Sequence, residues 1–181
     1  MSDHELNSGR MRRLMQAIGK RTIGYLKEDL EIPINKAYQI GEDVARMQLR
    51  ELTSILALDA AEIRLLLAFS FDHALADRVL TASADGLEIS ADERDEMREE
   101  AVGEMINIVA GNAIAGHGVG NQIIAITPPV VIKEAKSISR HKGATFRTIE
   151  VATASGMMSI HFVGPKDFFT MNLDYAEGIN E

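Results

Sequence analysis

Residues 103–112 read Gly-Glu-Met-Ile-Asn-Ile-Val-Ala-Gly-Asn. In an α-helix, at about 100° per residue, Glu104 and Asn107 share one polar stripe with Glu100 and Gly111. The apolar residues of the same region fall on a broad arc on the other side of the helix: Ala101, Val102, Met105, Ile108, Val109 and Ala113. We therefore expect a helix that covers a sheet with this arc and turns Glu104 and Asn107 away from the core.

The ends of this helix are also marked in the sequence. The segment Ser90-Ala-Asp-Glu93 has the S-x-x-E form of a capping box, so we expect the helix to start there. The segment Gly116-His-Gly-Val-Gly120 should end the helix after about Ala115. Phosphate-binding glycine loops follow a strand and open a helix, whereas these glycines follow a helix. We interpret them as a helix stop.

Gly111 is unusual because it lies on the polar stripe inside the expected helix. Glycine costs roughly 1 kcal/mol of helix propensity relative to alanine. Two interpretations remain open at this point. Gly111 could leave room for the backbone of another molecule, or it could allow tight packing of helices within this chain.

Upstream of this helix, the patterns predict two strands and a shorter helix. The apolar run at residues 65–69 is short enough for a buried strand, and Ser70 or Asp72 offers an N-cap for a helix through about Ala82. Residues 46–58 suit either a strand or a helix. We favour the strand, which gives the order strand, strand, helix.

Further elements complete an α+β domain. Residues 11–30 have apolar residues at helical spacing and predict a first helix that stops before Pro33. Residues 130–132 resemble a strand, and residues 145–153 and 157–163 predict a hairpin. We expect an antiparallel-rich sheet with long helices packed on it.

The composition is that of an ordinary globular domain. The chain has 181 residues, of which 46% are hydrophobic and 25% charged, with four prolines and no cysteine. A chain of this length buries roughly 70% of its unfolded surface and fits one domain. Because the chain has no cysteine, disulfides and thiolate metal sites are excluded. No apolar run reaches the ~20 residues of a membrane span, and the N-terminus does not resemble a secretory signal. We expect a cytoplasmic protein that does not span a membrane.

The net charge of -8 is concentrated in one region. Nine acids and two arginines lie between Asp85 and Glu104, which gives this stretch a charge of -7. Binding to nucleic acid requires a basic face, so we expect no nucleic-acid partner. The acids could stabilise the N-terminal end of a helix, and they could also steer a basic partner toward this surface.

The stripe resembles the signature of the CheX/CheC/FliY chemotaxis phosphatases. Glu104 and Asn107 match its glutamate and asparagine, and Pro129 fits the proline about twenty-two residues after the asparagine. The flanking Gly103 also fits the pattern. The family places Asp or Ser four residues before the glutamate, where this chain has Glu100. The resemblance covers residues 52–169 and is most specific between Gly103 and Pro129.

The resemblance implies an antiparallel sheet with two long helices and the motif on one of them, as in CheX. The first helix contains no glutamate followed three residues later by asparagine, so we expect one site per chain. It also implies a homodimer formed through the sheets. We expect residues 1–40 to form a tail and first helix of the same domain, residues 41–175 the CheX-like part, and residues 176–181 a tail.

The implied activity is hydrolysis of the aspartyl phosphate of a CheY-type response regulator. Asn107 would hold the attacking water and Glu104 would pair with a lysine of the regulator. Glu100 and Gly111 would contact the partner, and Gly103 and Pro129 would be structural. Mg²⁺ would be bound by the regulator, so we expect no metal or other cofactor on this chain. A non-catalytic module that binds response regulators or belongs to the flagellar switch is the alternative.

Overall fold

The computed structural model describes residues 3–40, 46–60, 63–116, 124–139 and 141–166. Among these residues, no helix is both long enough and apolar enough to cross a membrane.

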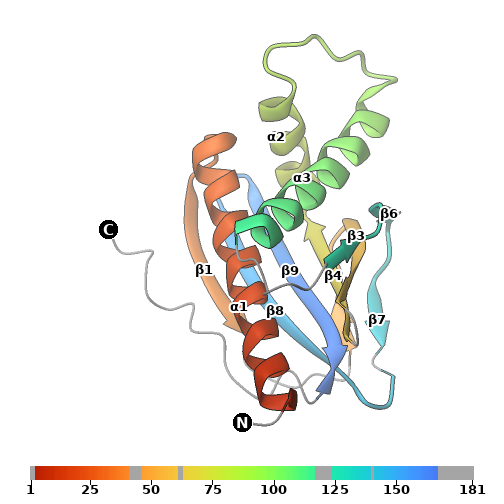
Figure 1. The fold of residues 1–181 in the computed structure, drawn as a ribbon. Coiled ribbons are helices and arrows are strands. Elements are labelled where there is room, and N and C mark those ends of the chain that lie inside the picture. The colour runs from red at the N-terminus through yellow and green to blue at the C-terminus, as the bar shows by residue number, and fades with distance from the viewer. Residues whose placement is uncertain (1–2, 41–45, 61–62, 117–123, 140, 167–181) are drawn as a thin grey trace.

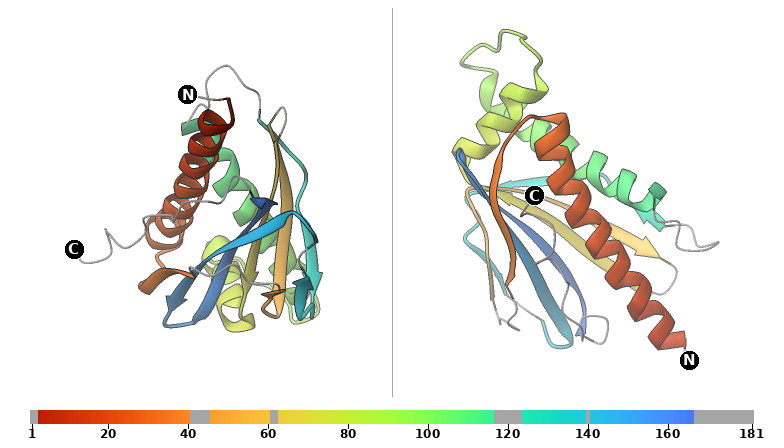
Figure 2. Two further views of the ribbon diagram at one scale, coloured as in Figure 1. Left: turned by 90° about the horizontal axis from the view of Figure 1, so that it is seen from below. Right: turned by 90° about the vertical axis from the view of Figure 1, so that its left-hand side faces the viewer.

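Three helices cover one face of a seven-stranded antiparallel sheet (Figure 1). The helices are α1 (Asp3–Gly24), α2 (His73–Ser83) and α3 (Arg94–Gly116). A short π-helix, η1 (Tyr25–Asp29), continues directly from α1. The two further views in Figure 2 show the same layering, with α1 and α3 on the same side of the strands. The expected α+β class is confirmed.

The strand order of the main sheet is β1-β8-β9-β4-β3-β5, and β6 also pairs with β3. These strands are β1 (Ile34–Ile40), β3 (Leu52–Ala60), β4 (Ile63–Phe71), β5 (Ile124–Ile126), β6 (Val130–Lys133), β8 (Ala144–Thr153) and β9 (Gly156–Pro165). A separate ribbon pairs β2 (Arg46–Gln48) with β7 (Ser137–Ser139).

Side chains alternate between the two faces of the sheet, as the period of two requires. On the helix side, paired residues such as Leu56 and Leu67 are 2% and 0% exposed and join the main core. On the opposite face, Ser70, Ser159 and Glu150 lie side by side across β4, β9 and β8. We call this opposite side the second face. It carries buried polar groups where the helix side carries an apolar core.

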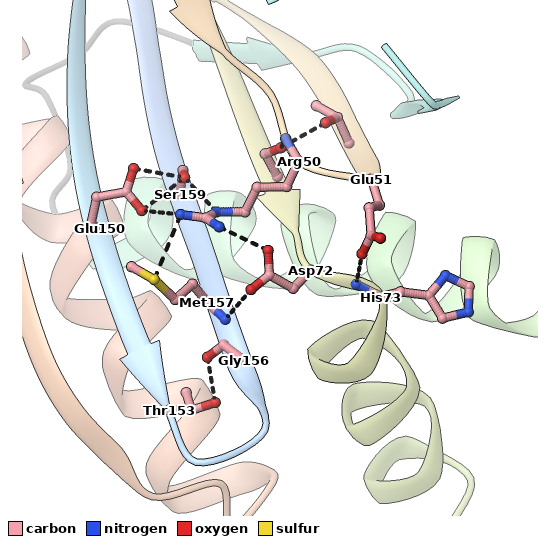
Figure 3. A network of polar contacts seen from close by, with 11 residues as sticks. Arg50, Glu51, Asp72, His73, Glu150, Thr153, Gly156, Met157 and Ser159 are labelled. Carbon is pink, nitrogen blue, oxygen red and sulfur yellow. Dashed lines mark hydrogen bonds and ion pairs between the residues drawn. The ribbon is translucent and has the colours of Figure 1, made fainter. Parts of the chain in front are cut away.

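Arg50 organises the polar groups of the second face (Figure 3). Its guanidinium donates to Asp72 Oδ1 at 2.8 Å, to Glu150 Oε2 at 2.7 Å and to Ser159 Oγ at 3.0 Å. Ser159 in turn donates to Glu150, and Asp72 Oδ2 accepts from the backbone N–H of Met157 at 2.8 Å. Arg50 lies two residues after the end of β2, so these bonds hold the β2–β7 ribbon against the second face.

Several local predictions are confirmed. Residues 46–58 contain strands and no helix, namely β2 and most of β3 with a break at residues 49–51, and the order strand, strand, helix is that of β3, β4 and α2. The hairpin prediction corresponds to β8 and β9, joined through Gly156, whose φ of +132° favours glycine. Asp72 is the N-cap of α2, and Ser70 lies within β4.

The first helix differs from its expected bounds. Regular α-helix begins at Asp3 and ends at Gly24, and the last turn before Leu30 widens into η1. Leu26 and Leu30 stay buried through this turn, at 0% and 6% exposure. The apolar spacing therefore continued past the point where the hydrogen-bond pattern changed. β1 was not predicted, because an edge strand with the sequence Ile-Asn-Lys-Ala-Tyr-Gln-Ile has little apolar alternation.

The caps also differ from the expected form. α3 begins at Arg94 and not directly after Ser90, whose hydroxyl donates to the carboxylate of Glu93. At α2, the Asp72 side chain makes no capping bond. Glu51, the residue before β3, caps the helix instead. Its Oε2 accepts from the N–H of His73 at 2.5 Å. At α2 a tertiary contact therefore replaces the local cap.

Candidate functional site

The polar stripe of α3 faces away from the sheet, as expected. Glu100, Glu104 and Asn107 are exposed, and Gly111 is partly exposed. The opposite side of the helix is in the core, with Val102, Met105, Ile106 and Val109 at 0% exposure. Ala101 and Ile108, at the edges of the predicted arc, are partly buried. The helical period therefore placed the stripe correctly.

Glu104 and Asn107 keep their polar atoms available. Within the described part of the chain, neither side chain makes a hydrogen bond or ion pair. Two other charged residues of α3 are paired: Arg98 donates to Asp77 Oδ1 at 2.8 Å, and Glu99 accepts from Lys133 at 2.5 Å. The carboxylate and carboxamide of the stripe are thus free to bind a second molecule.

One flank of the stripe is formed by the edge of the sheet. A Cβ on Gly103 would lie 3.8 Å from Pro129 Cγ and 3.8 Å from Val131 Cγ2. Pro128 and Pro129 interrupt the edge strand between β5 and β6, where proline is tolerated because no neighbouring strand needs its N–H. Thr127 keeps this break in register, since it exchanges two hydrogen bonds with the backbone of Ala57, at 3.0 and 2.9 Å.

The other flank is formed by α1 and η1 (Figures 1 and 2). The amide oxygen of Asn112, in the orientation that satisfies its contacts, accepts from Nε and Nη2 of Arg21 at 3.2 Å. Arg21 Nη2 also pairs with Asp29 at 2.7 Å, and its guanidinium carbon lies 5.4 Å from the ring centre of Tyr25. Burial raises the pKa of the Tyr25 phenol, and the nearby carboxylates of Asp29 and Glu104 raise it further, against the opposing charge of Arg21.

The surroundings of Gly111 separate its two interpretations. No described atom of the chain, apart from the helix itself and the adjoining residues, lies within 4 Å of the position that its Cβ would occupy. Gly111 is therefore not required for packing against the described residues. The open space agrees with the first interpretation, in which another molecule approaches the helix here.

A cavity among the described residues lies away from the stripe. A cavity of about 850 Å³ lies near the N-terminal end of α3, between His73, Arg98 and Lys133, and the stripe residues do not line it. No three His, Asp or Glu residues in the described ranges form a group that could hold a metal ion. The exposed carboxamide of Asn107 can position a water, and the carboxylate of Glu104 can bind a cationic group.

The chain belongs to the family of the chemotaxis phosphatase CheX, whose family model matches residues 53–152. The match runs from β3 to β8 and includes α3 with its stripe. No curated protein sequence matches the chain at a significant level.

Solved structures confirm the CheC/CheX-like fold. CheX from Desulfovibrio desulfuricans is 17% identical, with a TM-score of 0.65 over 83% of this chain and 98% of that one. CheX from Vibrio vulnificus is 20% identical, with a TM-score of 0.61 over 82% and 94%. A chain of the CheX-CheY-BeF3-Mg complex from Borrelia burgdorferi is 16% identical, with a TM-score of 0.64 over 83% of this chain and 96% of that one. At these identities the likeness concerns the fold.

The sequence patterns did not indicate the flank formed by Arg21, Tyr25 and Asp29. These residues precede α3 by more than sixty positions, and their charges resembled an ordinary solvated helix face. Only the crossing of α1 over α3 brings Arg21 into contact with Asn112 and carries Tyr25 and Asp29 to that side of α3.

Proposed function

We propose that this protein hydrolyses the aspartyl phosphate of a CheY-type response regulator, with Glu104 and Asn107 as its catalytic residues. The observation that carries the proposal is the pair itself: two polar side chains one turn apart on the exposed stripe of α3, without a bonding partner among the described residues, in a chain of the CheX family. The Borrelia CheX in complex with CheY, BeF3 and Mg²⁺ supports a partner of this class.

Asn107 positions the attacking water. An aspartyl phosphate is an activated acyl phosphate, so its hydrolysis depends on in-line placement and on charge stabilisation. A carboxamide both donates and accepts hydrogen bonds and does not titrate, so it can hold one water in one orientation. The exposed position of Asn107 lets it enter the partner's active site.

Glu104 docks the partner through a charge-assisted bond to a lysine beside the phosphoryl group. Glu100 lies one turn before it and adds negative charge to the same stripe, which speeds the encounter with a cationic surface. Gly111 leaves the space that the approaching backbone occupies. Mg²⁺ arrives bound to the regulator. A cytoplasmic location follows from such a partner.

We also propose a homodimer formed through the sheets. Five of the six exposed large hydrophobic side chains among the described residues lie on the second face: Tyr38, Ile40, Leu66, Val130 and Ile132. Their exposure of 36–61% leaves an apolar surface at both edges of the sheet and on β4. Pairing of two such surfaces would remove them from water.

Phosphate release from a magnesium-loaded, phosphorylated receiver domain of the same organism tests the activity. We expect wild-type protein to accelerate release and Asn107→Ala to lose on the order of 10²-fold in rate while binding persists, by analogy with the loss of one positioned transition-state contact. Asn35→Ala removes an exposed asparagine from β1 and serves as the matched control.

The same experiment decides the alternative. Binding of the receiver domain without any acceleration of phosphate release would identify an adaptor module that retains the docking helix. An Asn107→Ala variant as active as Asn35→Ala would remove Asn107 from the chemistry.

A further inference from the structure

The flank formed by α1 and η1 contains an aromatic side chain that the proposed chemistry does not use. Asn112 and Gly103 are nine residues apart on α3, which corresponds to about 180° around the helix axis. Asn112 contacts Arg21 of α1, and Gly103 packs on Pro129. The stripe with Glu104 and Asn107 therefore lies between two walls, and α1 with η1 is one of them.

The π-helical turn determines which residues this wall presents. η1 keeps Leu26 in the core at 0% exposure and leaves Tyr25 only partly buried, at the margin of that core. Asp29, one π turn later, stays exposed and pairs with Arg21. π-Helical turns occur frequently at functional sites, where they re-aim side chains without unwinding the helix.

Arg21 fixes the Tyr25 ring and does not compete with a cationic partner. Its guanidinium contacts the ring, pairs with Asp29 and donates to Asn112. The positive charge of Arg21 is thus balanced by Asp29, while Glu104 has no ion-pair partner among the described residues. Because Arg21 contacts both the Tyr25 ring and Asn112 of α3, the ring lies on the α1 side of the stripe that carries Glu104.

We propose that Tyr25 is a positioning residue of the docking site, where its ring receives the aliphatic stem of the lysine whose ammonium pairs with Glu104. Lysine commonly lays its methylene groups along apolar surface and keeps its charge at a polar group. A carboxylate beside a fixed aromatic ring offers both surfaces at once. This inference rests on the proposed docking of a receiver domain at α3 and adds a second helix to the docking site.

The test measures the dissociation constant of a receiver domain loaded with BeF3 and Mg²⁺, together with kcat and KM for phosphate release. We expect Tyr25→Ala to raise the dissociation constant and KM about 3- to 10-fold, the usual range for one aromatic contact, with kcat within about twofold of wild type. Tyr25→Phe keeps the ring and should restore wild-type binding. Leu87→Ala, which removes an exposed large hydrophobic side chain from the connection between α2 and α3, is the control.

Tyr25 borders the core, so a thermal melt must accompany each variant. Tyr25→Leu retains apolar packing without the flat ring and should bind as weakly as Tyr25→Ala. Binding by Tyr25→Ala equal to that of Leu87→Ala would overturn the inference, as would a loss in Tyr25→Phe as large as in Tyr25→Ala. A fall in kcat with unchanged binding would also overturn it. If the wild-type protein neither binds nor acts on the receiver domain, the proposed function itself fails.

Discussion

Pro129 packs on Gly103, with its Cγ 3.8 Å from the position that a Cβ on the glycine would occupy. This distance is an ordinary van der Waals contact, so the proline and the glycine are complementary without requiring the absence of a methyl group. The contact fixes the edge of the sheet against α3 one turn before Asn107. The contact explains how Pro129, twenty-two positions after Asn107 in the sequence, can lie next to the same stripe.

Replacement of the two glycines of α3 should separate packing from docking. Gly103→Ala and Gly111→Ala should each raise the free energy of unfolding by about 0.5–1 kcal/mol, because alanine is the better helix former and both positions have room for a methyl group. Only Gly111→Ala should weaken binding of the receiver domain. Urea unfolding and titration with the BeF3-loaded domain measure the two effects. Unchanged binding by Gly111→Ala would show that the receiver domain does not occupy the space beside Gly111.

The Arg50 network should contribute strongly to stability. Arg50→Ala leaves the carboxylate of Glu150, whose side chain is 11% exposed, without its cation. We expect a loss on the order of 2 kcal/mol, below the value for a fully buried pair because Arg50 itself is 23% exposed. Arg64→Ala is the matched control, because Arg64 pairs with Asp59 on the surface and should change stability little. Equal effects of both variants in urea unfolding would contradict this expectation.

His161 should make the protein sensitive to mild acid. Burial, together with the charge of Arg50, lowers the pKa of the His161 imidazole to about 3, and its Nδ1 lies 2.9 Å from Thr148 Oγ1. Below about pH 6.5 the unfolded chain binds a proton at this residue that the folded chain does not bind, so stability falls as the pH falls toward 3. Between pH 7 and 5, wild-type protein should lose about 2 kcal/mol more than His161→Gln.

Urea unfolding of both proteins at the two pH values measures this difference, because the contributions of all other groups cancel in the comparison. Parallel pH dependence of the two proteins would mean that the folded imidazole accepts the proton.

The proposed dimer should depend on the second face of the sheet. Leu66→Asp places a charge on β4 at a position that is 40% exposed and should shift the protein to monomer. Leu87→Asp, in the connection between α2 and α3 and 71% exposed, should leave the dimer intact. Sedimentation equilibrium distinguishes the two species. A wild-type monomer at all accessible concentrations would refute the dimer, and dissociation by both variants would place the interface elsewhere.

Much of the fold could be predicted because its signals are local. The apolar runs of β4 and the alternating hairpin of β8 and β9 specify strands through their own side chains. The period of α3 placed Val102 and Met105 inside and Glu104 and Asn107 outside before any contact was known. The three-residue strand β7 and the polar edge strand β1 lack such signals, and their pairing partners are distant in sequence.

The sequence by itself therefore determined the class of the fold, the helix that carries the site and the outward direction of Glu104 and Asn107, because helical and strand periods depend only on neighbouring residues. The tertiary structure decided what surrounds them. Pro129 against Gly103, Arg21 of α1 against Asn112 of α3, and Arg50 among Asp72, Glu150 and Ser159 are contacts between segments far apart in the chain. Such contacts follow from the order of the strands and the crossing of the helices, which no local pattern encodes.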